Sequence, residues 1–348
     1  MTISLTNPRR GAICAAVLSL AVAAGAQAQT QSKPCELIVQ RYRAELLARQ
    51  APSRQAVEGL VKSLDANGAW GDINYADTVR TAWDPANHLR RIAELALAYV
   101  HPDSPLKGSP AVRQAIGRAL ENFRDNRYRC PNWWYNEIGV PKIARDILVL
   151  MGPALAGEQR DKALALLRQH RIGMTGANLV DSAELGLFEG ALTADEPLVA
   201  RCAKLIADEI RVSAGEAIRP DFSFHQHGPR LMQFSYGSVF LGGTTRLAGE
   251  LRGTPWELPT EKIDILAEYV LSGSQWMVRG TFTVPATMDR ACSRKGSLAH
   301  ADLRVAAGRL VAAGPSPQHK EALEALIRRQ SGKGSPLVGY RYWPYSEF

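Results

Sequence analysis

Cysteine is scarce in this sequence and follows no recognisable spacing. Five cysteines are present, and Cys14 lies in the apolar N-terminal segment, which leaves Cys35, Cys130, Cys202 and Cys292. Their wide, irregular separation excludes the paired motifs that bind metals. Four cysteines permit three disulfide pairings, which the sequence does not rank, and buried free thiols are equally compatible with it.

Alternating strand patterns, low-complexity linkers and repeats of fixed period are also lacking. Residues 279–285 are the best short strand candidate, so the pattern gives no support to a fold built on sheets. Because no linker divides the chain, the roughly 320 residues after the N-terminal segment are expected to form one domain. Because no period recurs, a regular solenoid is not supported.

The one long apolar run lies at the N-terminus and has the layout of a signal peptide. Arg9-Arg10 precedes an apolar stretch over residues 13–24, and Ala26-Gln27-Ala28 matches a cleavage site. The run is too short and too rich in alanine to span a membrane. We therefore expect residues 1–28 to be removed. The mature domain, residues 29–348, would then be periplasmic or secreted, without a membrane partner.

The charge balance is basic, at a formal +8. Removing the two arginines of the signal lowers it to about +6, which would attract an acidic polymer but does not require one. No basic helix or loop motif is present, so nucleic-acid binding is disfavoured.

Apolar residues at helical spacing extend over almost all of the mature chain. Ser109-Pro110 and Ser316-Pro317 are start signals in which proline follows the capping residue, and Asp195 is a third capping candidate. Helices are expected near residues 36–50, 86–100, 110–123, 142–152, 158–170, 182–192, 195–206, 231–250, 259–273, 299–313 and 317–327. We therefore predict an all-α fold of about a dozen helices joined by short turns.

Residues 221–237 combine more reactive side chains than any other window. The groups that can move protons or bind an anion are His225, Gln226, His227, Arg230 and Tyr236. A Gly-Pro pair at residues 228–229 breaks regular structure, so we expect a loop that leads into the element after Tyr236. A polar surface turn with one or two core aromatics would have the same composition.

Four further clusters of polar and aromatic residues interrupt the helices, at residues 70–75, 132–139, 175–181 and 288–294. Trp133 and Trp134 suit a platform for sugar rings, or they simply pack between helices. Asn178 is equally suited to cap a helix. Arg290 and Arg294, four residues apart, would share a helix face and also fit a solvated stripe.

Taken together, these clusters resemble the catalytic α/α-toroid domain of the polysaccharide lyases. The large family covers hyaluronate, chondroitin and xanthan lyases, and smaller toroid-only families act on glucuronan and alginate. The similarity extends from about Trp70 to the C-terminus and rests on five motifs in order: Asn132-Trp133-Trp134 with Glu137-Ile138-Gly139, Thr175-Gly176-Ala177-Asn178, Asp221-x-Ser223-Phe224-x-Gln226-His227, Tyr236-Gly237 and Arg290-x-x-Ser293-Arg294.

The resemblance implies a single α/α toroid of helix hairpins over residues 29–348. It implies a reacting centre of Asn178, His227, Tyr236 and Arg290. The residues expected to contact the polymer are Trp70, Tyr75, Trp133, Trp134, Asn136, Glu137, His225, Gln226 and Arg294.

Two departures from the family bear on the substrate. Phe222 stands where the glycosaminoglycan and xanthan lyases usually have Gly. This chain also stops at residues 340–348, near the end of their toroid, without the β-sandwich domains that follow it there. We therefore expect a toroid-only lyase acting on β-1,4-glucuronan, with alginate second and a glycosaminoglycan as a further alternative.

Such lyases cut by β-elimination, which removes the C5 proton of a uronic acid and expels the glycosidic oxygen at C4. Asn178, aided by Arg290 or His227, would stabilise the charge that develops on the carboxylate, as an oxyanion hole does. In glucuronate and mannuronate the C5 hydrogen and O4 lie on the same side, so Tyr236 can take the proton and pass it to O4. His227 is the rival base. The chemistry needs no metal or other cofactor, and we expect a monomer whose partner is an anionic polysaccharide.

Three other interpretations stay open on the sequence. His225 and His227 would fit a metal site if a third ligand such as Asp72 or Asp221 joined them. Asp72 and Glu137 would fit the paired carboxylates of an α/α-barrel glycoside hydrolase. The aromatic platform alone would fit a periplasmic polysaccharide-binding protein without turnover.

Overall fold

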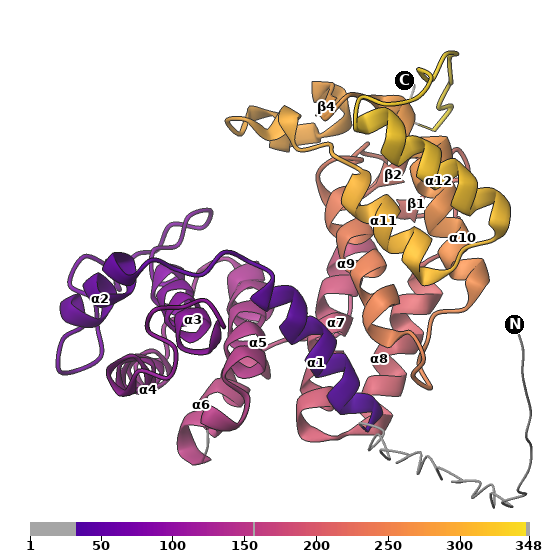
Figure 1. Cartoon of the computed structure of the whole chain (residues 1–348). Helices are drawn as coiled ribbons and strands as arrows, with labels where there is room; N and C mark the ends of the chain where they lie inside the picture. Colours follow the sequence, from indigo (N-terminus) through magenta and orange to yellow (C-terminus); the bar gives the residue numbers. More distant parts are fainter. Residues whose placement is uncertain (1–32, 156, 346–348) are drawn as a thin grey trace, which may run out of the picture. The chain divides into compact units, whose positions relative to one another are not determined.

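The computed structural model describes residues 33–155 and 157–345, and the regular secondary structure of this part of the chain is almost entirely helical (Figure 1). Its α-helices are α1 (Pro34–Leu47), α2 (Arg54–Ser63), α3 (Ala86–Val100), α4 (Pro110–Asp125), α5 (Val140–Met151), α6 (Gly157–Leu167), α7 (Gly176–Thr193), α8 (Glu196–Glu209), α9 (Tyr236–Leu251), α10 (Thr260–Glu268), α11 (Arg304–Ala313) and α12 (Pro317–Gln330). Strands in the described residues form two small antiparallel hairpins, β1 (Ala217–Ile218) with β2 (Phe224–His225) and β3 (Val278–Arg279) with β4 (Phe282–Thr283). The all-α prediction is confirmed, and the predicted signal peptide, residues 1–28, lies outside the described residues.

The apolar periodicity locates most helices to within a few residues. α3 occupies the predicted 86–100, and the Asp195 carboxylate accepts the amide of Leu198 at 3.0 Å, as a capping residue does. α2 is not predicted, although Val57, Leu60 and Val61 are spaced as on one face of a helix and pack against the core. The longest of the described α-helices, α7, has 18 residues. None of the helices in the described part combines the length and apolar character needed to cross a bilayer.

The four cysteines of the described chain are free thiols. Cys35, Cys130 and Cys202 are buried, and Cys292 is exposed. Burial raises the pKa of the Cys202 thiol to about 11, which keeps it protonated at neutral pH. Of the two alternatives that the sequence allows, the structure therefore has free thiols.

Most of the core lies between helices that are near one another in sequence. α3 packs against α4 and α5, α5 against α6, and α7 along α8. α9 packs against both α7 and α11, and α11 packs against α12. α1 returns across these pairs and contacts α5, α7 and α9 (Figure 1). The first helix therefore braces three helices that come much later in the chain.

A buried ion cluster joins the helices that α1 crosses. The Glu184 carboxylate of α7 pairs with Arg145 of α5 and with Arg246 of α9, the latter at 2.5 Å. The ring of Tyr42, on α1, lies 4.5 Å from the guanidinium carbon of Arg145 and 4.7 Å from that of Arg246. The Glu184 side chain is only 3% exposed, so its charge is tolerated because two guanidinium groups pair with it.

The cluster contains one carboxylate more than its two guanidinium groups can neutralise. The three carboxylates belong to Asp146, Glu184 and Glu250. Burial alone would raise the pKa of Glu184, but Arg246 and Arg145 overcome this effect and hold the pKa at about 2. Burial, opposed by Arg246 and reinforced by Glu184, raises the pKa of Glu250 to about 7. Glu250 is therefore the member that binds a proton as the pH falls.

Replacing Glu250 with Gln should reduce the loss of folding stability as the pH rises. The folded-state pKa, about 7, lies above the ordinary value of 4.5. The stability that the bound proton contributes is therefore complete below about pH 4.5 and is lost as the pH rises through 7. Glu250→Gln has no such proton to lose, so it should match the wild type near pH 5 and exceed it by about 1–3 kcal/mol at about pH 8.

Urea unfolding at both pH values measures this difference, with Glu261→Gln, a change at an exposed glutamate of α10, as the control. If the free energy of unfolding of the wild type instead rose relative to that of Glu250→Gln toward pH 8, Glu250 would not be the group that holds the proton.

Candidate functional site

A pocket of about 1160 Å³ brings together residues from distant parts of the chain. Its walls come from the segment before α3, the start of the π-helix η1 (Tyr135–Gly139) and the residues before it, the first turns of α7 and α9, and the 3₁₀ helices η6 (Asp289–Ser293) and η7 (Ser297–Ala299). Seven of the thirteen predicted site residues line it: Trp133, Trp134, Asn178, His227, Tyr236, Arg290 and Arg294.

The amino ends of two neighbouring helices open into this pocket. Tyr236 is the first residue of α9, and Asn178 is the third residue of α7. The two helices pack against each other, and both of these side chains line the pocket. The amino end of a helix carries partial positive charge, so both helix ends favour a negative charge in the space between them.

The start of α7 is fixed by two side chains and one glycine. The amide of Gly176 donates to the Glu209 carboxylate, and the amide of Ala177 donates to Oε1 of Gln226 at 3.1 Å. Gly176 has a φ of +57°, and a Cβ at this position would lie 2.2 Å from the same Gln226 oxygen. Glycine therefore allows both the left-handed backbone and the close approach of Gln226 that hold the first turn of α7.

Three of the predicted reacting groups are in contact. Arg290 donates from Nη2 to the phenol oxygen of Tyr236 at 3.1 Å. The imidazole of His227 stands perpendicular to the Tyr236 ring, with the ring centroids 4.9 Å apart. A negative charge on the phenol oxygen would be stabilised by the guanidinium group and by the amino end of α9. The arrangement is therefore suited to a tyrosine that gives up and regains its proton.

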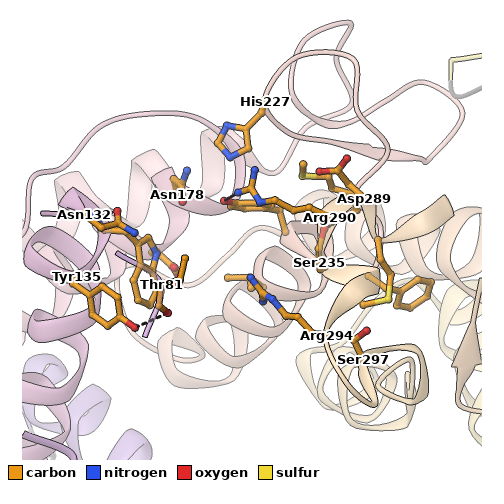
Figure 2. A pocket seen from close by; sticks show the side chains of 18 of the residues that line it. Thr81, Asn132, Tyr135, Asn178, His227, Ser235, Asp289, Arg290, Arg294 and Ser297 are labelled. Carbon is orange, nitrogen blue, oxygen red and sulfur yellow. Dashed lines mark hydrogen bonds between the residues drawn. The ribbon is translucent and has the colours of Figure 1, made fainter. Parts of the chain in front are cut away.

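Figure 2 shows the two faces of the pocket. Arg290 and Arg294 reach into it from the 3₁₀ segment, and Asn132 lies on the opposite wall. Trp133, beside Asn132, is 41% exposed, so its indole ring has free surface for a ligand. Trp134 also lines the pocket but is half-buried, with its ring centroid 5.4 Å from that of Tyr135. Packing between helices therefore describes Trp134 better than Trp133.

The pocket is cationic. Six basic side chains line it, from Arg80, Arg90, Lys142, Arg290, Arg294 and Lys295, against the two acidic side chains of Asp181 and Asp289. Lys142 pairs with Asp181 at 2.6 Å, which leaves the four arginines and Lys295 to make the pocket cationic. An excess of one sign in a concave site concentrates ligands of the opposite sign. The pocket is therefore suited to a polyanion.

Known proteins similar to this chain are polysaccharide lyases. Residues 27–329 match the N-terminal α-helical domain of polysaccharide lyase family 8. The chain belongs to this family.

The relatives agree in fold and extend well beyond this domain. Chondroitinase-AC of Pedobacter heparinus is 32% identical over 259 residues, which cover 72% of this chain and 37% of that protein. A solved chondroitinase AC lyase matches 87% of this chain and 45% of its own, with a TM-score of 0.78 and 28% identity. A Paenibacillus xanthan lyase shares the fold at a TM-score of 0.74 and 22% identity, over 85% of this chain and 31% of its own. The α/α-toroid prediction is confirmed, and the family 8 domain spans less than half the length of these relatives.

Two aromatic residues predicted to contact the polymer lie away from the pocket of this family 8 domain. Trp70 is fully buried, and its indole N–H donates to the carbonyl of Leu60 at 3.0 Å. The Tyr75 hydroxyl bonds Nδ1 of His88 at 2.8 Å and accepts the Trp70 amide at 3.0 Å. The predicted sugar contact is therefore wrong for Trp70, which has no surface to offer. Tyr75 packs against the core instead of lining the pocket.

The four other predicted contact residues are not among the side chains that line the pocket. The Asn136 carboxamide bonds both the amide and the carbonyl of Cys130, at 3.0 and 2.8 Å. Glu137 faces Arg171 at 3.6 Å. His225, in β2, is 1% exposed, and Gln226 is equally buried against the start of α7. Their polar groups bond the backbone and neighbouring side chains, and none of the four lines the pocket, so their predicted contacts with the polymer stay predictions.

The residues proposed for a glycoside hydrolase site and for a metal site also do not come together in the pocket. Asp72 pairs with Arg91 at 2.6 Å, and neither Asp72 nor Glu137 lines the pocket. A hydrolase with these two carboxylates therefore has no shared site. His225 is buried in β2 whereas His227 faces the pocket. In the described part of the chain, no group of three His, Cys, Asp or Glu side chains is placed to hold a metal ion.

Several pocket residues are absent from the predicted set, among them Arg80, Lys142 and Asp181. Asp181 comes three residues after Asn178 and therefore lies on the same face of α7, a spacing that could have identified it. Arg80 and Lys142 stand in no motif. Arg80 lies in the segment before α3, where its carbonyl accepts the Asn132 side-chain amide at 2.9 Å, and Lys142 reaches the pocket through the packing of α5.

Gly176→Ala should destabilise the domain by about 1–3 kcal/mol, because it adds both a strained φ and a collision with Gln226. Gly242→Ala, inside α9, is the matched control, because nothing lies within 4 Å of an added Cβ there. That change should be neutral or stabilise by up to about 1 kcal/mol. Urea unfolding compares the two variants, and equal stabilities would show that Gln226 does not fix the start of α7.

Proposed function

We propose that this family 8 domain binds an anionic polysaccharide and cleaves it by β-elimination at a 4-linked uronic acid, with a glycosaminoglycan, chondroitin or hyaluronan, as the substrate. Two relatives support this choice, because they are named as a chondroitinase and a hyaluronate lyase. None of these names supports the expectation of glucuronan or alginate. The observation that carries the proposal is the contact of Tyr236 with Arg290 and His227 in a cationic pocket that Asn178 also lines.

The reaction needs the carboxylate of the uronic acid to accept charge. As the C5 proton leaves, its electron pair moves toward the carboxylate, and the intermediate resembles a dianion at that group. Asn178 is the amide donor for the carboxylate oxygen, and the amino end of α7 adds partial positive charge beside it. Arg290 or His227 would supply further stabilisation to the same charge.

Tyr236 is the base and then the acid. Its phenolate removes the C5 proton, the C5 electron pair forms the C4–C5 double bond, and the bond from C4 to the glycosidic oxygen breaks. Tyr236 then returns the proton to that oxygen, which restores the phenolate. One group can do both because the C5 hydrogen and O4 of a glucuronate lie on the same side. Arg290, 3.1 Å from the phenol oxygen, stabilises the phenolate between steps.

Incubation with single polymers should give an unsaturated product from chondroitin or hyaluronan. Elimination leaves a double bond conjugated to the carboxylate, which absorbs in the ultraviolet, whereas hydrolysis leaves none. We expect absorbance to rise with one or both of these polymers and to stay flat with glucuronan and polymannuronate. Product from glucuronan alone would reverse the substrate choice. Folded protein that forms no unsaturated product from any of these polymers would contradict the proposal.

Tyr236→Phe should lose turnover by about 10³-fold or more and keep its affinity for an oligosaccharide, because only the proton-carrying oxygen is removed. Calorimetric titration gives the affinity, and product absorbance gives the rate. Tyr340→Phe, at a tyrosine that is 97% exposed and outside the pocket, is the matched control. Wild-type turnover by Tyr236→Phe would favour a different base, with His227 first.

Trp133→Ala should weaken oligosaccharide binding about 10-fold, because an exposed aromatic anchor at the pocket is lost. Phe282→Ala is the control, since Phe282 is 59% exposed on β4 and does not line the pocket. Its affinity should equal that of the wild type. Equal affinities for both variants would remove Trp133 from the binding surface.

A further inference from the structure

Glu216, immediately before β1, is bonded from two sides. Its Oε2 accepts the Thr175 hydroxyl at 2.5 Å and the Gln226 side-chain amide at 2.7 Å. Its Oε1 accepts the backbone amide of Gly228 at 2.8 Å, and the His227 amide bonds the same carboxylate. One carboxylate therefore joins the loop that carries His227 to the residue that precedes α7.

The strand register explains how Glu216 reaches this position. β1 and β2 are antiparallel with Ala217 opposite His225, so the next pair along the ladder sets Glu216 opposite Gln226. The chain then turns through His227, and Gly228 follows. The pairing of β1 with β2 therefore brings the Glu216 carboxylate close to His227 and Gly228, although Glu216 and Gly228 are twelve residues apart.

The backbone at His227 needs such a partner. His227 has a φ of +60° and Gly228 a φ of +84°, so a non-glycine residue adopts a left-handed conformation at the edge of the pocket. Consecutive amides in such a turn point to one side and form a concave site for an anion. The Glu216 carboxylate occupies that site. Without it, two amides would lose their acceptor and the loop could relax toward an ordinary φ.

The carboxylate is held in its charged form. Burial alone would raise the pKa of Glu216, but the bonds from Thr175 and Gly228 and the proximity of His227 lower it instead. Glu216 is therefore ionised at neutral pH, as an acceptor of four donors must be.

We propose that Glu216 is a positioning residue, which fixes the imidazole of His227 relative to Asn178 across the pocket. Glu216 itself does not line the pocket. It holds the His227 loop against Thr175, and Thr175 is the residue from which α7 and Asn178 begin. The proposal rests on the proposed elimination for its effect on rate, and on these hydrogen bonds alone for its effect on the loop.

Glu216→Gln tests the proposal with almost no change in size. Each carboxylate oxygen faces N–H or O–H donors, so either orientation of the amide sets an NH₂ group against a donor. We expect kcat to fall about 10- to 100-fold, because His227 moves, and KM to change by less than about threefold, because Trp133 and Arg294 still hold the polymer. Glu261→Gln, exposed on α10, is the control and should keep both constants.

Thr175→Val adds an independent test, because it removes one donor from the α7 side and keeps the branched shape. It should lower kcat in the same direction, and the double variant with Glu216→Gln should be no slower than Glu216→Gln alone. Wild-type kcat in Glu216→Gln would overturn the proposal. So would independent, multiplicative losses in the double variant, or a rise in KM that accounts for the whole loss.

Hydrogen exchange separates this proposal from the proposed function. In the peptide over residues 222–232, the amides of His227 and Gly228 should exchange faster in Glu216→Gln than in the wild type, and not in Glu261→Gln. If the wild type forms no unsaturated product, the elimination fails, and faster exchange still supports Glu216 as the residue that holds the loop. Unchanged exchange in a folded Glu216→Gln overturns the proposal whatever the activity.

Discussion

The pairing of Glu184 with Arg145 and Arg246 is the constraint on which the site depends. A carboxylate with 3% of its side chain exposed is stable only while both guanidinium groups stay in place. Because the three residues belong to α7, α5 and α9, a shift of any one helix by a turn would leave buried charge without a partner. The buried ion pairs therefore fix the tilt and register of these helices independently of the pocket residues.

The packing of α5, α7 and α9 around Glu184 also determines the geometry of the pocket. Asn178, Asp181 and Glu184 are spaced by three residues and share a face of α7, and Lys142, three residues before Arg145 on α5, pairs with Asp181. A polar face of α7 thus extends from the buried cluster to the first turn of the helix. The same packing brings Tyr236, at the amino end of α9, to the pocket that Asn178 lines. The buried residues of α5, α7 and α9 therefore position the residues that line the pocket.

The all-α fold could be predicted from the sequence, because amphipathic helices repeat their buried apolar residues at a regular spacing. α2 was not predicted, although its short apolar face of Val57, Leu60 and Val61 has the same periodicity. The reacting residues were recognisable because Tyr236 and Arg290 stand in motifs that resemble a known family. Trp70 and Asn136 have equally suitable chemistry but point inward, since a motif gives proximity along the chain and not the direction of a side chain. Arg80 reaches the pocket only through tertiary packing, which no local pattern encodes.

The convergence of these groups on one sugar ring is tested most directly by a crystal structure of Tyr236→Phe bound to a uronate tetrasaccharide. The uronate carboxylate should lie within hydrogen-bonding distance of the Asn178 amide, about 2.7–3.2 Å. The C5 hydrogen and O4 of the same ring should both face residue 236, with Arg290 beside them. A tetrasaccharide bound with its carboxylate away from Asn178, or with C5 turned from residue 236, would contradict elimination at this site.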